Sequence, residues 1–167
     1  MSDELNQAAS EVLLAEPESQ YGNQYRSDYL TQYRDYVATA DSISARRNAA
    51  NSFFLTLNTA FLGARGYFEV SGWETVIVQV LVGSLFSFVW WRMIQSYKAL
   101  NTSKFTVIQL MEQNLPLASY SAEWFVHKNS PDSRSSLSSI ESWIPGLFIL
   151  LHVAVAVFYL IGTGTDG

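Results

Sequence analysis

The sequence predicts an all-α integral membrane protein with three transmembrane helices and amphipathic cytosolic helices, assembled as a homo-oligomer. Hydrophobic residues make up 49% of the chain and charged residues only 15%. The apolar residues are concentrated in blocks and do not recur at the spacing of a soluble core, which is typical of membrane proteins. The lysines and arginines gather in the segments that one side of a membrane would hold.

Residues 1–45 precede the apolar blocks. Residues 1–22 are rich in Ser, Glu and Gln, and we expect a flexible acidic leader there, with one short helix around residues 8–15. Residues 23–45 are expected to form a cytosolic amphipathic helix, because no Gly or Pro interrupts residues 24–45 and apolar or tyrosine residues recur at spacings of three and four. These residues are Tyr25, Tyr29, Leu30, Tyr33, Tyr36 and Val37.

Residues 46–93 predict a transmembrane hairpin, with spans at about 47–64 and 73–93. The connection between the spans is so short that they must be antiparallel. Cations and tryptophans stand at the ends of the spans, where the membrane meets water, and are expected to anchor them. These predicted interface anchors are Arg46, Arg47, Trp73, Trp90, Trp91 and Arg92.

Residues 94–140 are water-compatible and predict a cytosolic helical segment followed by a loop. Its main helix is expected to stop near Leu115 and Pro116, because proline cannot continue a helix. Ser138 and Glu141 form a predicted capping box ahead of a third transmembrane helix at residues 141–163. Residues 164–167 are a short outer tail.

The distribution of cations predicts the topology. With three crossings, nine of the ten cations fall on one side and only Arg65 on the other, which places the N-terminus in the cytoplasm and the C-terminus outside. The alternative is two crossings with residues 144–162 buried in protein, and it is disfavoured because His152 is the one ionisable residue there apart from Tyr159. The nine cations are Arg26, Arg34, Arg46, Arg47, Arg92, Lys98, Lys104, Lys128 and Arg134.

A polar intramembrane seam is the most specific internal signal. Asn51 and Asn58 are seven residues apart and therefore share one side of the first span. Asparagine is costly in hydrocarbon unless it is paired, so this side should face protein or water. Hydrogen bonds between the two spans are the simplest explanation, and a water-filled pathway or a small-ligand site are the alternatives. The predicted seam consists of Asn48, Asn51, Asn58 and Thr59 in the first span and Gln79, Ser84 and Ser87 in the second.

Composition disfavours several classes of function. A net charge of −5 argues against a nucleic-acid binder, and the chain has no cysteine and two histidines, so neither a metal site nor a cofactor site is expected. No catalytic motif is present, and we expect no enzyme. His152 is a candidate titratable gate inside the membrane, although a neutral packing histidine is the simpler interpretation.

Several residues resemble those of a known family. Arg46-Arg47-Asn48 and the following run to Asn58, then Trp90-Trp91-Arg92, Lys104-Phe105 and Leu115-Pro116, are similar to the RipA family of octameric bacterial membrane proteins. The resemblance covers roughly residues 25–127 and implies a protein of the bacterial inner membrane that forms a ring of about eight subunits, without a known enzymatic activity. Together with the three crossings and the topology predicted from the cations, this makes it a multi-pass protein whose C-terminus lies in the periplasm. A looser resemblance, in architecture alone, is to the small membrane effectors called SLATT domains.

These observations predict a non-enzymatic oligomeric inner-membrane protein that forms a pore or channel-like ring with a cytosolic collar. Its expected partners are the lipid bilayer, further copies of the chain and a cytosolic protein, with no nucleic acid. The alternative is a membrane scaffold or effector subunit whose cytosolic helices recruit a partner and whose spans conduct nothing.

Overall fold

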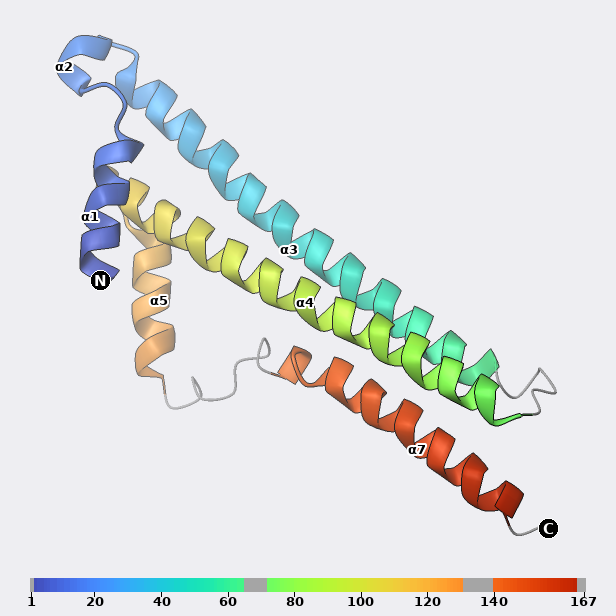
Figure 1. The fold of residues 1–167 in the computed structure, drawn as a ribbon. Coiled ribbons are helices and arrows are strands. Elements are labelled where there is room, and N and C mark those ends of the chain that lie inside the picture. The colour runs from blue at the N-terminus through green and yellow to red at the C-terminus, as the bar shows by residue number, and fades with distance from the viewer. Residues whose placement is uncertain (1, 65–71, 131–139, 165–167) are drawn as a thin grey trace. The chain divides into compact units, whose positions relative to one another are not determined.

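The structure, a computed structural model, describes residues 2–64, 72–130 and 140–164 (Figure 1). The described residues form helices and contain no strand, which confirms the all-α prediction for this part of the chain. The helices are α1 (Ser2–Leu13), α2 (Glu18–Tyr21), α3 (Tyr25–Ala64), α4 (Trp73–Glu112), α5 (Ser119–Asn129) and α7 (Ile144–Gly164).

The chain divides into two compact units. Unit 1 comprises Met1–Ala45 and Ala99–Arg134, and unit 2 comprises Arg46–Lys98 and Ser135–Gly167. Helices α3 and α4 run through both units, so residues expected to form a cytosolic helix and a transmembrane span belong to one continuous helix in each case. A helix of 40 residues is about 60 Å long, and the hydrocarbon core of a bilayer is only about 30 Å thick. Neither helix can therefore lie wholly inside a membrane.

The ends of these elements differ from some of the predicted ones. Helix α4 ends at Glu112, ahead of the predicted stop at Leu115 and Pro116, because the chain turns over Gln113 and Asn114. The leader predicted to be flexible contains α1 and α2, in agreement with its content of the good helix formers Ala, Leu, Glu and Gln. The predicted capping box involves Ser138, which lies outside the described residues.

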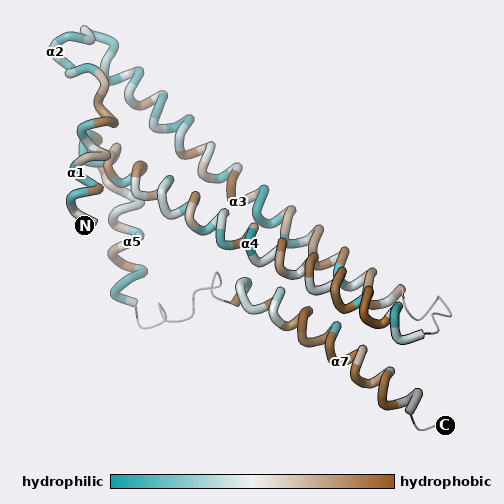
Figure 2. Tube along the Cα trace, viewed as in Figure 1, coloured by the Kyte–Doolittle hydropathy of each residue, from teal (hydrophilic) through white to brown (hydrophobic). Residues whose placement is uncertain are grey.

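Unit 2 is built from the second half of α3, the first half of α4, and α7. Its core contains Phe54 from α3, Trp90 and Ile94 from α4, and Phe148 from α7. The rings of Phe54 and Trp90 are stacked, with centroids 6.2 Å apart. Figure 2 shows that hydrophobic residues are concentrated in α7 and in the part of α4 beside it. The three helices therefore share one apolar core.

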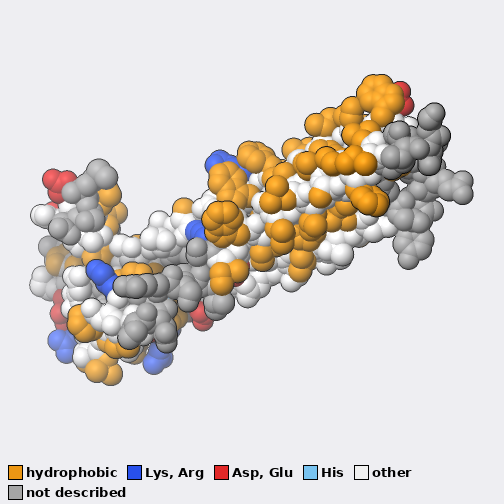
Figure 3. Space-filling view, turned by 90° about the horizontal axis from the view of Figure 1, so that it is seen from below, with side chains coloured by type: hydrophobic (Ala, Val, Ile, Leu, Met, Phe, Trp, Pro, Cys, Tyr) orange, Lys and Arg blue, Asp and Glu red, His pale blue; other side chains and the backbone are white. Residues whose placement is uncertain are grey.

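Two of the described helices are long and apolar enough to cross a membrane, and three were predicted. They are α4 and residues 144–161 of α7, and only 22% of the apolar window in each is buried within the chain. Figure 3 shows apolar side chains gathered along unit 2 with few charged ones among them. Helix α3 does not meet the same criterion, because Asn48, Asn51 and Asn58 lower the hydropathy of its second half.

Candidate intramembrane polar site

Asn58 is buried against α4. Asn58 and Ser87 are both 0% exposed. The Ser87 hydroxyl donates a hydrogen bond of 3.0 Å to Asn58 Oδ1, and Asn58 Nδ2 donates one of 2.9 Å to the carbonyl oxygen of Phe54. Both ends of the amide are thus paired, as a buried amide requires. Asn58 faces the neighbouring helix of its own chain.

Asn51 makes a second contact between the same two helices. The indole N–H of Trp90 donates a hydrogen bond of 3.0 Å to Asn51 Oδ1. Trp90 is only 2% exposed, so the prediction that it anchors the chain at the membrane surface is wrong. Its neighbour Trp91 is exposed, as is Trp73 at the start of α4. Of the three tryptophans predicted as anchors, these two have side chains that can reach lipid headgroups.

The other seam residues of α3 point away from α4. Asn48 and Thr59 are exposed, and Ser52 and Thr56 lie between them on the same side, at spacings of four, four and three residues. These four residues form the α3 polar stripe. Gln79 and Ser84 on α4 are partly buried. The predicted seam is therefore divided into an inner side that faces α4 and an outer stripe that the chain itself does not cover.

His152 lies in the interior of unit 2 and is 1% exposed. Its ring centroid is 5.9 Å from that of Phe61 on α3, and a Cβ atom at Gly83 on α4 would overlap the imidazole. Glycine at position 83 is what gives the ring its space. Among the described residues, neither ring nitrogen has a hydrogen-bond partner, although an unpaired buried polar group is costly.

Charged residues hold the start of α7 at one end of unit 2. Arg47 Nε lies 3.8 Å from Glu141 Oε2, and the ammonium group of Lys98 donates a hydrogen bond to the Ser142 hydroxyl. Arg46 and Arg92, the remaining cations predicted as anchors, are exposed. This end of unit 2 therefore carries four cations, Arg46, Arg47, Arg92 and Lys98.

Unit 1 contains a buried carboxylate that the sequence did not reveal. Glu112 is 1% exposed and accepts hydrogen bonds from the backbone N–H groups of Tyr120 (2.8 Å) and Ser121 (2.9 Å) and from the Ser121 and Tyr33 hydroxyls. Tyr120 and Ser121 lie in the first turn of α5, where N–H groups lack partners within the helix. Glu112 therefore caps α5, and its charge is favourable at the helix N-terminus.

The same contacts shift two pKa values. Burial by itself raises the pKa of Glu112, but the hydrogen bonds from Tyr120, Ser121 and Tyr33 outweigh burial, so the pKa is lowered. Burial, together with the adjacent negative charge of Glu112, raises the pKa of Tyr33 to about 12. Both groups are therefore held in their usual charge states at neutral pH, the carboxylate ionised and the phenol protonated.

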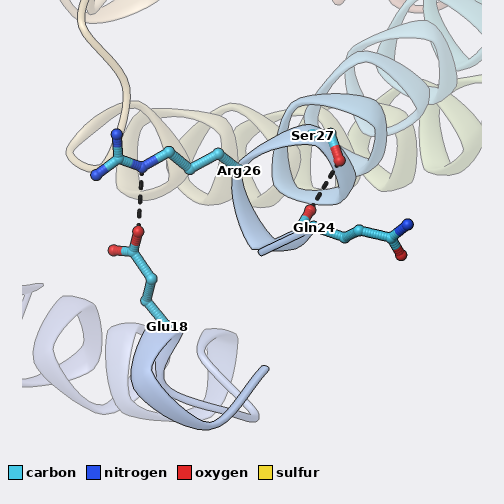
Figure 4. A network of polar contacts seen from close by, with 4 residues as sticks. All are labelled: Glu18, Gln24, Arg26 and Ser27. Atoms are coloured by element: carbon cyan, nitrogen blue, oxygen red, sulfur yellow. Dashed lines mark hydrogen bonds and ion pairs between the residues drawn. The ribbon is translucent and has the colours of Figure 1, made fainter. Parts of the chain in front are cut away.

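A second set of polar contacts in unit 1 lies at the start of α3 (Figure 4). Arg26 Nε donates to Glu18 Oε1 at 3.0 Å, and Ser27 Oγ donates to the carbonyl oxygen of Gln24 at 2.8 Å. The Arg26 and Glu18 side chains are mostly exposed, and such pairs contribute about 0–1 kcal/mol. The adjoining open groove, of about 440 Å³, is lined by Glu18, Tyr25, Arg26, Tyr29, Leu30, Asn114, Leu115 and Pro116. We assign no function to it.

Comparison with known proteins assigns the family. A family model described as the octameric membrane protein family (8xMP) matches residues 30–161. The chain belongs to this family. The match confirms the resemblance to octameric membrane proteins that the sequence predicts. No curated protein and no solved structure matches the chain.

In this 8xMP chain, the residues with paired or buried polar groups fall into two places. Asn51, Asn58 and His152 lie inside unit 2, and Glu112 lies inside unit 1. Among the described residues, no group of three or more His, Asp or Glu side chains could hold a metal ion. Unit 2 therefore offers neutral hydrogen bonds and one imidazole, and unit 1 offers one carboxylate that is already bound by four hydrogen-bond donors.

Proposed function

We propose that the chain forms a homo-oligomeric ring in the bacterial inner membrane, that each subunit crosses the membrane three times, and that the α3 polar stripe faces a water-filled pore. The protein acts without enzymatic chemistry. The strongest support is the α3 polar stripe, whose amide and hydroxyl groups are exposed although α3 packs along the apolar helix α4.

The pairing with α4 supports a crossing by α3. Phe61 packs on Phe86, Asn58 bonds to Ser87, and Asn51 bonds to Trp90. These contacts follow the two helices in opposite directions through the apolar part of α4. If α4 crosses the bilayer there, the second half of α3 occupies the same depth and crosses as well.

The exposed surfaces of the three helices differ in polarity. On α4 and α7 the exposed residues in the apolar segments are mostly Leu, Ile, Val and Phe, which suits lipid. The α3 polar stripe is Asn48, Ser52, Thr56 and Thr59. The exposed residues that flank it include the small Ala49 and Gly63 and the large apolar Phe53 and Leu55. Polar side chains on a membrane helix face protein or water. In a ring of identical subunits, stripes from all copies can meet around one axis.

The cations set the orientation in this proposal. Arg46, Arg47, Arg92 and Lys98 lie at the end of unit 2 where α3 and α4 continue into unit 1. Positive residues favour the cytoplasmic side, so unit 1 is cytosolic and forms the collar. The C-terminus then faces the periplasm.

Ion conduction tests the pore. Purified full-length protein in planar bilayers should carry current, and Thr56→Val, which removes one stripe hydroxyl at nearly constant volume, should lower the unitary conductance by about twofold or more. Thr39→Val is the matched control, because Thr39 is exposed in unit 1, and it should leave conductance unchanged. Absence of current at every voltage and pH would refute the pore.

A scaffold that conducts nothing is the second candidate. Trp124, Phe125 and Val126 are exposed on α5 in unit 1, and exposed aromatic residues outside a membrane often mark a protein contact. In this case Phe125→Ser should abolish binding of a cytosolic partner without altering assembly, and no variant of the stripe should affect any current.

A further inference from the structure

A line of polar groups runs through the interior of unit 2, separate from the α3 polar stripe. It follows one face of α4 and the residue before it, because Gly72, Gln79, Gly83, Ser87 and Trp90 are separated by seven, four, four and three residues. Trp90 lies 18 positions after Gly72, which corresponds to about 27 Å along a helix and is close to the hydrocarbon thickness of about 30 Å. The line is therefore about as long as the hydrocarbon core of a membrane is thick.

Side chains of α3 and α7 meet this face at successive levels. The contacts, from one end to the other, are the Gly72 N–H donating to Tyr159 Oη at 3.4 Å, the His152 ring over Gly83, Ser87 donating to Asn58, and Trp90 donating to Asn51. Gln79 fills the level between Tyr159 and His152, and its Nε2 atom is inaccessible to solvent. Each level contributes at least one polar group.

His152 is the titratable group at the middle of this line. The group facing it from α3 is the Phe61 ring and from α4 is the bare backbone of Gly83, so neither helix brings a charge to the imidazole. Within the described apolar segments of α3, α4 and α7, the other titratable side chains are Glu74 and Tyr159, which lie near one end. An ionisable residue at membrane depth usually marks an ion or proton pathway.

We propose that His152 is a proton-binding site and that each subunit carries protons across the membrane through it. A hydronium ion on one side transfers its proton to the unprotonated ring nitrogen, which forms imidazolium and leaves water. The N–H of the opposite nitrogen then passes its proton to water on the other side, which restores neutral imidazole. Exchange between the two ring tautomers resets the site, so one proton crosses in each cycle.

This inference rests on the membrane crossing proposed above and does not depend on the central pore. A water-filled pore carries protons as well as larger ions, whereas the His152 line carries only protons within a subunit. Proton entry is therefore measured in Thr56→Cys after a charged thiol reagent has blocked the stripe, and the His152 and His127 variants below are made in this background. Potassium release before and after the block reports on the pore separately.

Proton flux into vesicles tests the site. Full-length protein is reconstituted in vesicles of phosphatidylcholine and phosphatidylglycerol that contain a pH-sensitive dye, and an imposed potential drives proton entry. We expect His152→Gln to reduce the flux at least tenfold, since glutamine cannot be protonated in this range. The matched control is His127→Gln, the same change at the only other histidine, which should keep the wild-type flux. Wild-type flux no faster than that of empty vesicles, or full flux in His152→Gln, would overturn the proposal.

A direct titration covers the case in which His152→Gln fails to assemble. In His127→Gln, His152 is the sole histidine, so its imidazole nitrogens can be followed by ¹⁵N NMR in bilayers. They should respond to bulk pH within roughly pH 5 to 8. Nitrogen signals that stay unchanged from pH 4 to pH 9 would show that protons do not reach the ring and would overturn the proposal.

Discussion

The two units satisfy their buried polar groups in different ways. In unit 2 the buried groups that pair between helices are neutral, as Asn58 does with Ser87 and Asn51 with Trp90. In unit 1 the buried group is the charged carboxylate of Glu112, which four donors from α3 and α5 stabilise. A carboxylate surrounded by hydrocarbon would be far more costly than an amide. The difference agrees with a membrane environment for unit 2 and an aqueous one for unit 1.

The largest loss of stability is expected when the buried carboxylate of Glu112 is removed. Glu112→Ala leaves the first N–H groups of α5 without their acceptor and should destabilise the attachment of α5 by about 2 kcal/mol. Amide hydrogen exchange at Tyr120 and Ser121 should accelerate accordingly. The control is Glu123→Ala, because Glu123 is exposed on the same helix. Equal exchange rates in both variants would show that Glu112 is not the cap.

The second effect is the pH dependence of the same contact. Because the folded-state pKa of Glu112 is lowered below the value of about 4.5 for a free glutamate, its stabilising contribution is complete above that value and is lost as the pH falls through the folded-state pKa. We expect α5 to lose its protection from exchange under acid conditions. Glu112→Gln should remove this dependence, and an acid transition that persists in Glu112→Gln would assign it to another group.

Removing the neutral hydrogen bond between Asn58 and Ser87 in unit 2 should change stability the least. Asn58→Leu removes the bond to Ser87, and interhelical hydrogen bonds of this kind average about 0.6 kcal/mol in membranes. The oligomer should therefore persist in detergent, with a small loss of thermal stability. Combining it with Ser87→Ala should cost little more than the single change, because the two groups pair with each other. Additive losses would mean that each residue has other partners.

Sequence patterns predicted the helix pair and its inner polar side, because residues four or seven apart must share a face and a buried amide needs a partner. Trp90 was misassigned, since Trp-Trp-Arg looks the same whether the first ring faces lipid or the protein core. The Glu112 cap was missed because it joins α4 to α5 across a turn, and only the tertiary fold brings them together. The sequence features that could have indicated this cap were Glu112, four residues before Pro116, and the serines Ser119 and Ser121 at the start of α5.

Helix α3 shows where composition and packing disagree. Its three asparagines keep it below the apolarity of a membrane span, yet two of them, Asn51 and Asn58, bind it to α4, which is apolar enough to cross. A hydropathy average is calculated over one helix at a time and takes no account of the neighbouring helices. The cost of a polar group in a membrane depends on its partner, which only the structure identifies.

In the proposed ring, the outer stripe of α3 faces water while the exposed surface of α4 faces lipid. The chain contains no cysteine, so single cysteines can be placed at Thr56 and, as the control, at Leu81, which is exposed on α4. A charged, membrane-impermeant thiol reagent should modify Thr56→Cys and block the current, and it should leave Leu81→Cys unmodified. Modification of Leu81→Cys with Thr56→Cys unreactive would contradict this arrangement.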